Sequence, residues 1–279
     1  MRPEHKVLAR QMHACAGLAM RRYAGTRFML TAVLLAALPL LLIVIMTVSM
    51  RLRQHVPTPA EQDQIFQFLL RTMYLHFVVF FVAIHNGFAI ARQDLDDRTL
   101  HYILLQPIPR WAVVVSRVIA FAVISGALIL GSVWLTYAIW KIGLAGPGGL
   151  VRDLLGESRG LVRLLRESGV LMLAMIGYGA IGMLVGSIFK SAVPVAMVWL
   201  WEGLLAFLPQ ALKELTLAHY LQSLLPGALT GQRRLLELLG EPAGTLQSIL
   251  VIAIVAGAAL AMTILVFHFR ECVYAEEQQ

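Results

Sequence analysis

Acidic and basic residues crowd into one short stretch of this chain, ARQDLDDRTLHYILLQPIPRW at positions 91–111, between two long apolar runs. Elsewhere the residue types that do catalytic chemistry are dispersed. The aspartates lie outside the apolar runs, the histidines are scattered, and the sequence contains no HExxH zinc motif. An intramembrane protease requires paired catalytic groups or a bound metal ion. The sequence therefore argues against that class of enzyme.

Nucleotide chemistry is also unexpected within this chain. The sequence contains neither a GxxxxGK[ST] phosphate-binding loop nor the strand pattern of a soluble α/β domain. Cys15 and Cys272 belong to no CxxC motif and no Cys/His cluster, and both are expected in the reducing cytoplasm. We therefore expect no enzyme activity, no disulfide, no metal and no cofactor bound by this chain itself.

The composition is that of an integral membrane protein. Of 279 residues, 59% are hydrophobic and only 14% are charged, and the mean hydropathy is +0.75. A helix needs about 20 apolar residues to cross about 30 Å of hydrocarbon. The sequence predicts an all-α protein with a six-helix transmembrane domain over 28–269, with spans at about 28–50, 73–91, 112–140, 169–188, 192–208 and 246–269.

The distribution of Lys and Arg predicts the topology. Residues 1–27 carry six Lys and Arg against one acid, Glu4, so this segment is expected in the cytoplasm. Six crossings then return the tail, 270–279, to the same side. Within the first segment, Leu8, Met12, Cys15 and Ala19 share one helical face, which predicts an amphipathic helix at the membrane interface; a plain basic tail is the alternative. No run of basic and aromatic residues points to nucleic acid.

The stretch at 91–111 connects the second and third predicted spans on the cytoplasmic side. Its acids are typical of a helix N-terminus, and its Leu and Ile residues recur at i, i+3 and i+4. Two prolines end the pattern before Arg110 and Trp111 begin the next span. The pattern predicts a short amphipathic helix held against the membrane, or alternatively a solvated turn. The acids are Asp94, Asp96 and Asp97, the apolar residues Leu100, Ile103 and Leu104, and the prolines Pro107 and Pro109.

Three polar residues fall within the predicted spans. Glu202 lies in the fifth, where an acid is costly unless it is paired, protonated or facing a cavity. A structural hydrogen bond, a coupling or dimer contact, and a substrate contact are the roles we consider for it. His85 and Asn86 are adjacent in the second span and must face different directions. Interhelical hydrogen bonds are favoured for them over lining of a transport pathway.

Small residues form a flank on the fourth predicted span. Gly182 and Gly186 make a GxxxG pair, which permits two helices to approach closely. Packing within the chain is favoured over a seam between two copies.

The chain resembles a permease subunit of the type-2 ABC exporter family. In that family a stretch close to REREDGTLELLLTTPVSRW follows the second span and forms the coupling helix, which docks on the ATPase subunit. Two differences stand out: Arg98 replaces a frequent Gly, and Asp replaces Glu at Asp94 and Asp96. The matching positions here, without a gap, are Asp94, Asp96, Asp97, Thr99, Leu100, Ile103, Leu104, Pro107, Arg110 and Trp111.

The resemblance implies a transport complex in the bacterial cytoplasmic membrane. It implies an ABC ATPase partner that binds ATP and magnesium, and a second permease that is a second copy or a related chain. It also implies short re-entrant or interfacial helices between the fifth and sixth spans, where 212–225 and 229–239 are suitably apolar. Residues 94–110 would couple the two subunits, and the exported substrate stays open.

Two other functions remain as alternatives. A secondary transporter driven by an ion gradient would favour inverted repeats and charges near the midplane, for which Glu202 is a single candidate. A membrane assembly factor that transports nothing is the other. A neighbouring gene for a free-standing ABC ATPase would favour the exporter over both.

Overall fold

The chain is helical throughout the part that the structure describes. The computed structural model describes residues 3–54, 57–96, 109–156, 160–191, 193–205, 214–225 and 243–276, and these residues contain no strand. The elements are α1 (Pro3–Ala24), α2 (Arg27–Leu52), α3 (Pro59–Leu69), the π-helix η1 (Leu70–Val79), α4 (Phe80–Asp96), α6 (Arg110–Leu155), α7 (Gly160–Ile188), α8 (Val193–Leu205), α10 (Leu217–Leu224) and α12 (Thr245–Glu276).

Five of the described helical segments are long and apolar enough to cross a membrane. Each begins or ends within two residues of a predicted span, but three of them extend well beyond it. The all-α membrane class predicted from composition is confirmed at this level. The five segments are Phe28–Leu52, Pro59–Arg92, Trp111–Leu155, Gly160–Ile188 and Thr245–Phe267.

The second span begins 14 residues earlier than predicted, at Pro59 instead of residue 73. Thr58 caps this helix: its hydroxyl accepts from the Glu61 N–H, and the Glu61 carboxylate accepts from the Thr58 N–H at 2.8 Å. Pro59 stands at the first helical position, where its missing N–H costs nothing. The first turns of α3 contain acids and amides, so they do not belong to the apolar run from which this span was predicted.

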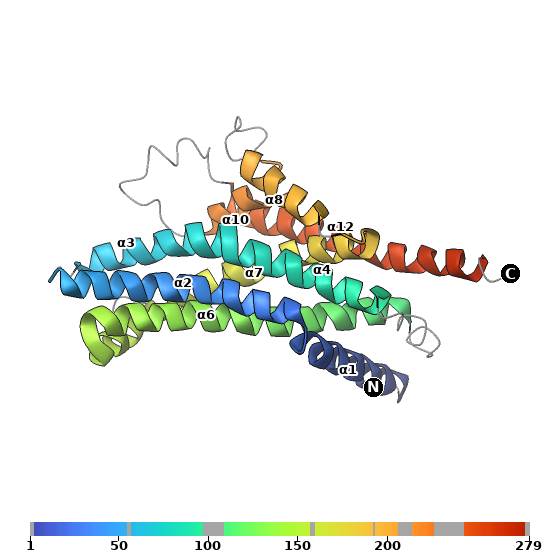
Figure 1. Ribbon diagram of the computed structural model, residues 1–279, viewed down its shortest axis with the longest axis horizontal. Helices are drawn as coiled ribbons and strands as arrows, with labels where there is room; N and C mark the ends of the chain where they lie inside the picture. Colours follow the sequence, from blue (N-terminus) through green and yellow to red (C-terminus); the bar gives the residue numbers. More distant parts are fainter. Residues whose placement is uncertain are drawn as a thin grey trace.

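The third span also runs past its predicted end, to Leu155 instead of residue 140. The chain bends sharply within α6 at Gly146, whose φ of 74° and ψ of 176° lie in a region that suits glycine alone. Pro147 follows and begins the next helical stretch. The last part of α6 therefore folds back on the bundle (Figure 1).

The fifth predicted span corresponds to α8, of which 13 residues are described. These rise about 20 Å, less than the hydrocarbon thickness. Six complete crossings therefore stay a prediction. The short helix α10 occupies part of the connection between α8 and α12, in the region where short helices are expected.

α7 lies at the centre of the bundle and packs against α4, α6 and α12, while α2 packs on α6 and α4. These helices run along the length of the molecule, with α8 and α10 on one side (Figure 1). α1, the end of α4, the start of α6 and the end of α12 all lie at the same end (Figure 1). We call this the α1 end, and the end formed by the start of α3 the α3 end.

Candidate functional site

The predicted coupling segment lies mostly outside the described residues. Asp97, Arg98, Thr99, Leu100, Ile103, Leu104 and Pro107 are among the residues that the structure does not describe. Its two flanks are described. Asp94 and Asp96 are in the last turn of α4, and Arg110 is the first residue of α6. Both flanks lie at the α1 end (Figure 1).

Asn86 joins three helices near this end. Its side chain is fully buried; Oδ1 accepts a hydrogen bond from the Tyr23 hydroxyl of α1, and Nδ2 donates to Ser125 Oγ of α6 at 2.8 Å. Burial raises the pKa of Tyr23 above its ordinary value, so the phenol stays a neutral donor. The amide therefore ties α1 and α6 to α4, which makes it a structural hydrogen-bonding group.

His85 faces a different neighbour. Its Nε2 is 3.2 Å from Thr31 Oγ1 of α2, and its ring lies 5.0 Å from that of Phe28, centroid to centroid. The two adjacent polar residues thus serve two different helix contacts, as their positions on a helix require.

Glu202 binds the N-terminus of α10. Oε1 accepts from the Leu217 N–H at 3.1 Å, and Oε2 accepts from the Ala218 N–H at 3.2 Å and from the Tyr178 hydroxyl at 3.4 Å. The first N–H groups of a helix lack partners within the helix and form its positive end. Because the carboxylate has three donors, its contacts are structural and join α8, α7 and α10.

A seam of glycines brings α4 and α7 into backbone contact. A Cβ atom built on Gly182 would lie 2.4 Å from the Ile84 carbonyl oxygen, and one on Gly186 would lie 2.5 Å from that of Phe88. Gly87 of α4 fits against α7 in the same manner. The GxxxG pair therefore faces a helix of its own chain.

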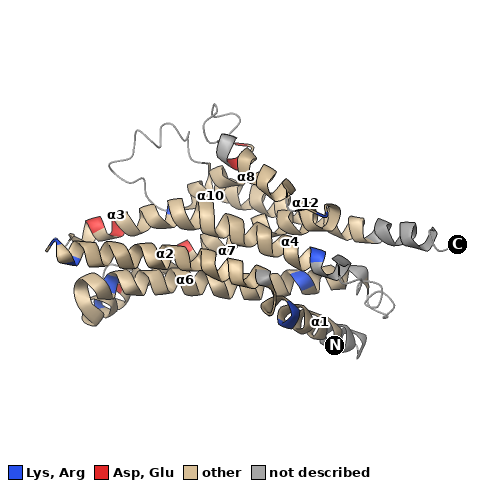
Figure 2. Ribbon diagram, in the orientation of Figure 1, with Lys and Arg blue, Asp and Glu red and all other residues tan. Residues whose placement is uncertain are grey.

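An ionic cluster at the α3 end was not anticipated from the sequence. Asp63 of α3 accepts two bonds from the Arg163 guanidinium of α7, at 2.6 and 3.0 Å, and one from Lys141 Nζ of α6 at 3.0 Å. Lys141 also lies 3.5 Å from Asp153 Oδ1, and the Tyr137 hydroxyl donates to Asp153. Figure 2 shows acidic and basic residues gathered at this end.

The bend at Gly146 is what allows this cluster to form. Lys141 and Asp153 are 12 residues apart in α6. In a straight helix this spacing would separate them by about 18 Å. Since their charged atoms are 3.5 Å apart, the chain must turn back between them. The Lys141 side chain is only 4% exposed, so the two aspartates compensate a cation that would otherwise be buried alone.

Glu167 lies one helical turn beyond Arg163 on α7. It is 2% exposed, and its Oε2 atom is buried without a hydrogen-bond partner among the described residues. Arg163, Asp63 and Arg71 act on it electrostatically. Sequence reasoning missed this acid because 160–168 was assigned to a loop; the apolar residues around it, GLVRLLRES, are the signal that the helix begins earlier.

The π-helix η1 contacts α10. Arg71 Nη2 donates to the Leu225 carbonyl at 3.2 Å. His76 Nε2 lies 2.6 Å from Gln222 Nε2, an amide donor, so Nδ1 must carry the ring proton and donate to the Arg71 carbonyl at 2.7 Å. These bonds fix one tautomer of His76 and hold α10 against the bundle.

Among the described residues, no three His, Cys, Asp or Glu side chains are grouped to hold a metal ion. Comparison with known proteins gives no further assignment: no family model, no curated protein and no solved structure matches this chain.

Proposed function

We propose that this chain is the transmembrane permease subunit of an ABC exporter in the bacterial cytoplasmic membrane. A separate ABC ATPase would bind ATP and magnesium, and a second permease, identical or related, would complete the transport complex. The observation that carries the proposal is the ungapped resemblance of residues 94–111 to the coupling helix of type-2 exporters.

The positions of the flanking helices support this assignment. α4 enters the segment and α6 leaves it at the α1 end, the same end at which α12 finishes (Figure 1). An even number of crossings brings both ends of a chain to one side of a membrane. The described charges at this end are basic (Figure 2), which favours the cytoplasmic side.

The contacts of α4 indicate how motion at the segment would spread. The glycine seam holds α4 against α7, and Asn86 bonds it to α1 and α6. A push by the ATPase on residues 97–108 would therefore act on a packed unit of several helices. Alternating access then requires that this unit move relative to the rest of the bundle.

Co-purification of the tagged chain from its native membrane in mild detergent, followed by mass spectrometry and an ATPase assay, tests the proposal. We expect a stoichiometric ABC ATPase, and we expect the pair Leu100→Asp and Leu104→Asp to remove it. Leu155→Asp, at a position 77% exposed and at the other end of the bundle, is the matched control and should retain the ATPase. A folded chain that purifies without an ATPase would contradict the proposal.

Asp97→Lys tests the coupling step separately. The substitution reverses one charge without removing an apolar contact, so we expect the ATPase to remain bound while its stimulation by the permease is lost. Normal stimulation in this variant would exclude charge complementarity at Asp97 as part of the coupling.

One observation favours a second candidate, a transporter driven by an ion gradient. Glu167 is a buried acid with an oxygen lacking a described partner, and buried ionisable groups in membranes commonly serve ion pathways. Collapse of the proton gradient at constant ATP distinguishes the two functions. Loss of transport under that condition, together with absence of any bound ATPase, would favour the second candidate.

A further inference from the structure

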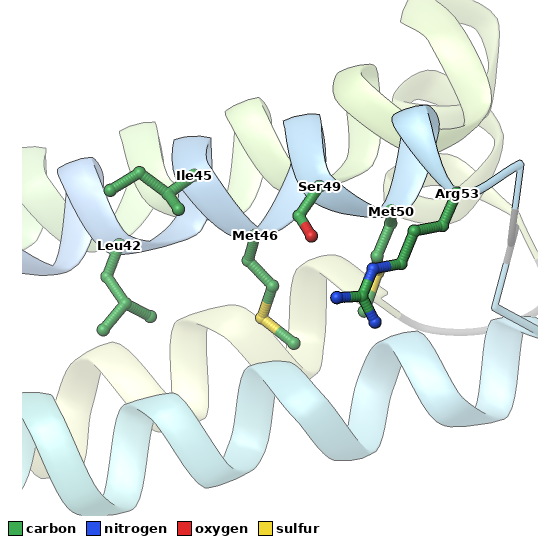
Figure 3. Close-up of a pocket in the computed structure, with 6 residues that line it drawn as sticks. All are labelled: Leu42, Ile45, Met46, Ser49, Met50 and Arg53. Carbon is green, nitrogen blue, oxygen red and sulfur yellow. The ribbon is translucent and has the colours of Figure 1, made fainter.

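An open groove runs along one side of α2, and the six residues that line it all belong to this helix (Figure 3). Its volume is about 650 Å³, and it is open to the side of the molecule. The lining residues follow one another at helical spacing along α2. They are Leu42, Ile45, Met46, Ser49, Met50 and Arg53.

The lining changes character along the helix. Leu42, Ile45 and Met46 make the inner part apolar, Ser49 and Met50 follow, and Arg53 closes the outer end. In Figure 3 the Arg53 side chain turns back over the groove beside Met50. A ligand that matches this order is an amphiphile with an apolar chain and an anionic head.

The dimensions match one leaflet of a bilayer. Leu42 and Arg53 are 11 residues apart, which corresponds to about 16 Å along a helix. Half of a hydrocarbon core about 30 Å thick is about 15 Å. Arg53 directly follows the last residue of this apolar helix, so we expect its guanidinium at the level of the headgroups and the apolar part of the groove toward the bilayer centre.

The guanidinium of Arg53 favours a phosphate as the anionic head of the ligand. A guanidinium presents planar paired donors that suit a phosphate, and it is less tightly hydrated than an ammonium group. Arg51, two residues earlier, contacts α6 instead: its Nε donates a hydrogen bond to the Gly143 carbonyl at 2.6 Å. Arg53 is the cation that lines the groove.

We propose that this groove binds an anionic phospholipid of the surrounding bilayer, with one acyl chain along Leu42, Ile45 and Met46 and the phosphate at Arg53. The site is independent of the coupling segment and of the proposed export function. It would hold a resident lipid against the second half of α2, whatever the substrate is.

Native mass spectrometry of the purified full chain, after exchange into nanodiscs of phosphatidylglycerol or phosphatidylcholine, tests the proposal. We expect one retained lipid per chain and a preference for phosphatidylglycerol of roughly three- to tenfold, the range for a charge-assisted contact at an exposed arginine. Arg53→Gln should abolish the preference. Arg152→Gln, which removes an exposed arginine that does not line the groove, is the control and should leave it unchanged.

Met46→Trp tests the chain-binding part, because a larger side chain fills the groove. We expect it to remove the retained lipid of either class while α2 stays folded by circular dichroism. Equal losses in Arg53→Gln and Arg152→Gln would overturn the proposal, as would retention of lipid in Met46→Trp.

A second copy of this chain is the other possible occupant. Ile45→Cys, in a background where Cys15 and Cys272 are replaced by alanine, gives a cross-linked dimer if two copies meet at this face. Efficient cross-linking in nanodiscs would overturn the lipid assignment, and its absence together with a retained phosphatidylglycerol would support it.

Discussion

Two groups of contacts, one at each end of the helical bundle, use different kinds of bond. At the α3 end, Asp63, Lys141, Arg163 and Asp153 form ion pairs across α3, α6 and α7. At the α1 end, the contacts around Asn86 are hydrogen bonds between uncharged groups. Lys141 is nearly buried, so removal of its acidic partner leaves an uncompensated charge, whereas a neutral hydrogen bond contributes about 1 kcal/mol. We therefore expect removal of one charge from the α3-end cluster to cost more stability than removal of the Asn86 amide.

Asp63→Leu should produce the largest effect. It leaves Arg163 and the nearly buried Lys141 without their shared acid, so we expect a loss of about 3–5 kcal/mol in the free energy of unfolding. Denaturant unfolding in detergent, followed by tryptophan fluorescence, measures it. The double variant Asp63→Leu and Arg163→Leu should lose less than Asp63→Leu alone, and a larger loss would show that the charges are not coupled.

Gly146→Ala tests the α3 end by straining the backbone at the bend in α6. Its φ and ψ lie in a region that alanine adopts only with strain, so we expect a loss of about 1–3 kcal/mol and a weakened contact between Lys141 and Asp153. Gly148→Ala is the matched control, since a Cβ there meets nothing within 4 Å and its φ is not positive. Equal stability of the two variants would contradict the role given to the bend.

Asn86→Leu measures how much the hydrogen bonds at the α1 end contribute to the free energy of unfolding. It leaves the buried hydroxyls of Tyr23 and Ser125 without their partner, and we expect a loss of about 1–2 kcal/mol, smaller than that of Asp63→Leu. Hydrogen exchange should rise in α1 but not in α3. Combining it with Tyr23→Phe in a double-mutant cycle isolates the bond, and additive losses would mean that the two residues do not interact.

Glu202→Gln should have the smallest effect. The amide still accepts at one oxygen but loses the charge that favours the N-terminus of α10, so a loss of about 0.5–1 kcal/mol is expected. Faster hydrogen exchange at Leu217 and Ala218 is the local readout. A change confined to α12 would argue against Glu202 as the group that caps α10.

Apolar length alone predicted the membrane class and at least one boundary of each of the five long helical segments. The boundaries failed where charged residues belong to a helix: Asp63 and Glu167 were assigned to loops because their neighbours interrupt the apolar runs. The TPAE sequence at residues 58–61 is a recognisable helix start and would have extended the second span.

The sequence does not predict which charged residues form ion pairs with one another. Asp63 and Arg163 are 100 positions apart, and only the packing of α3 on α7 decides that they meet. The direction of the bend at Gly146 was likewise not predictable, because a Gly-Pro pair indicates that a helix breaks but not which way the chain then turns. By contrast, the different directions of His85 and Asn86 followed from helical geometry and agree with the partners that the structure gives them.

The helical segment from Pro59 to Asp96 runs without interruption from one end of the bundle to the other. Its 38 residues are 11 in α3, 10 in η1 and 17 in α4. Asp63 stands near its first turn, and Asp96, which belongs to the proposed coupling segment, is its last residue. A displacement imposed at Asp96 would therefore be passed along one continuous helical segment to the residue that holds Arg163 and Lys141.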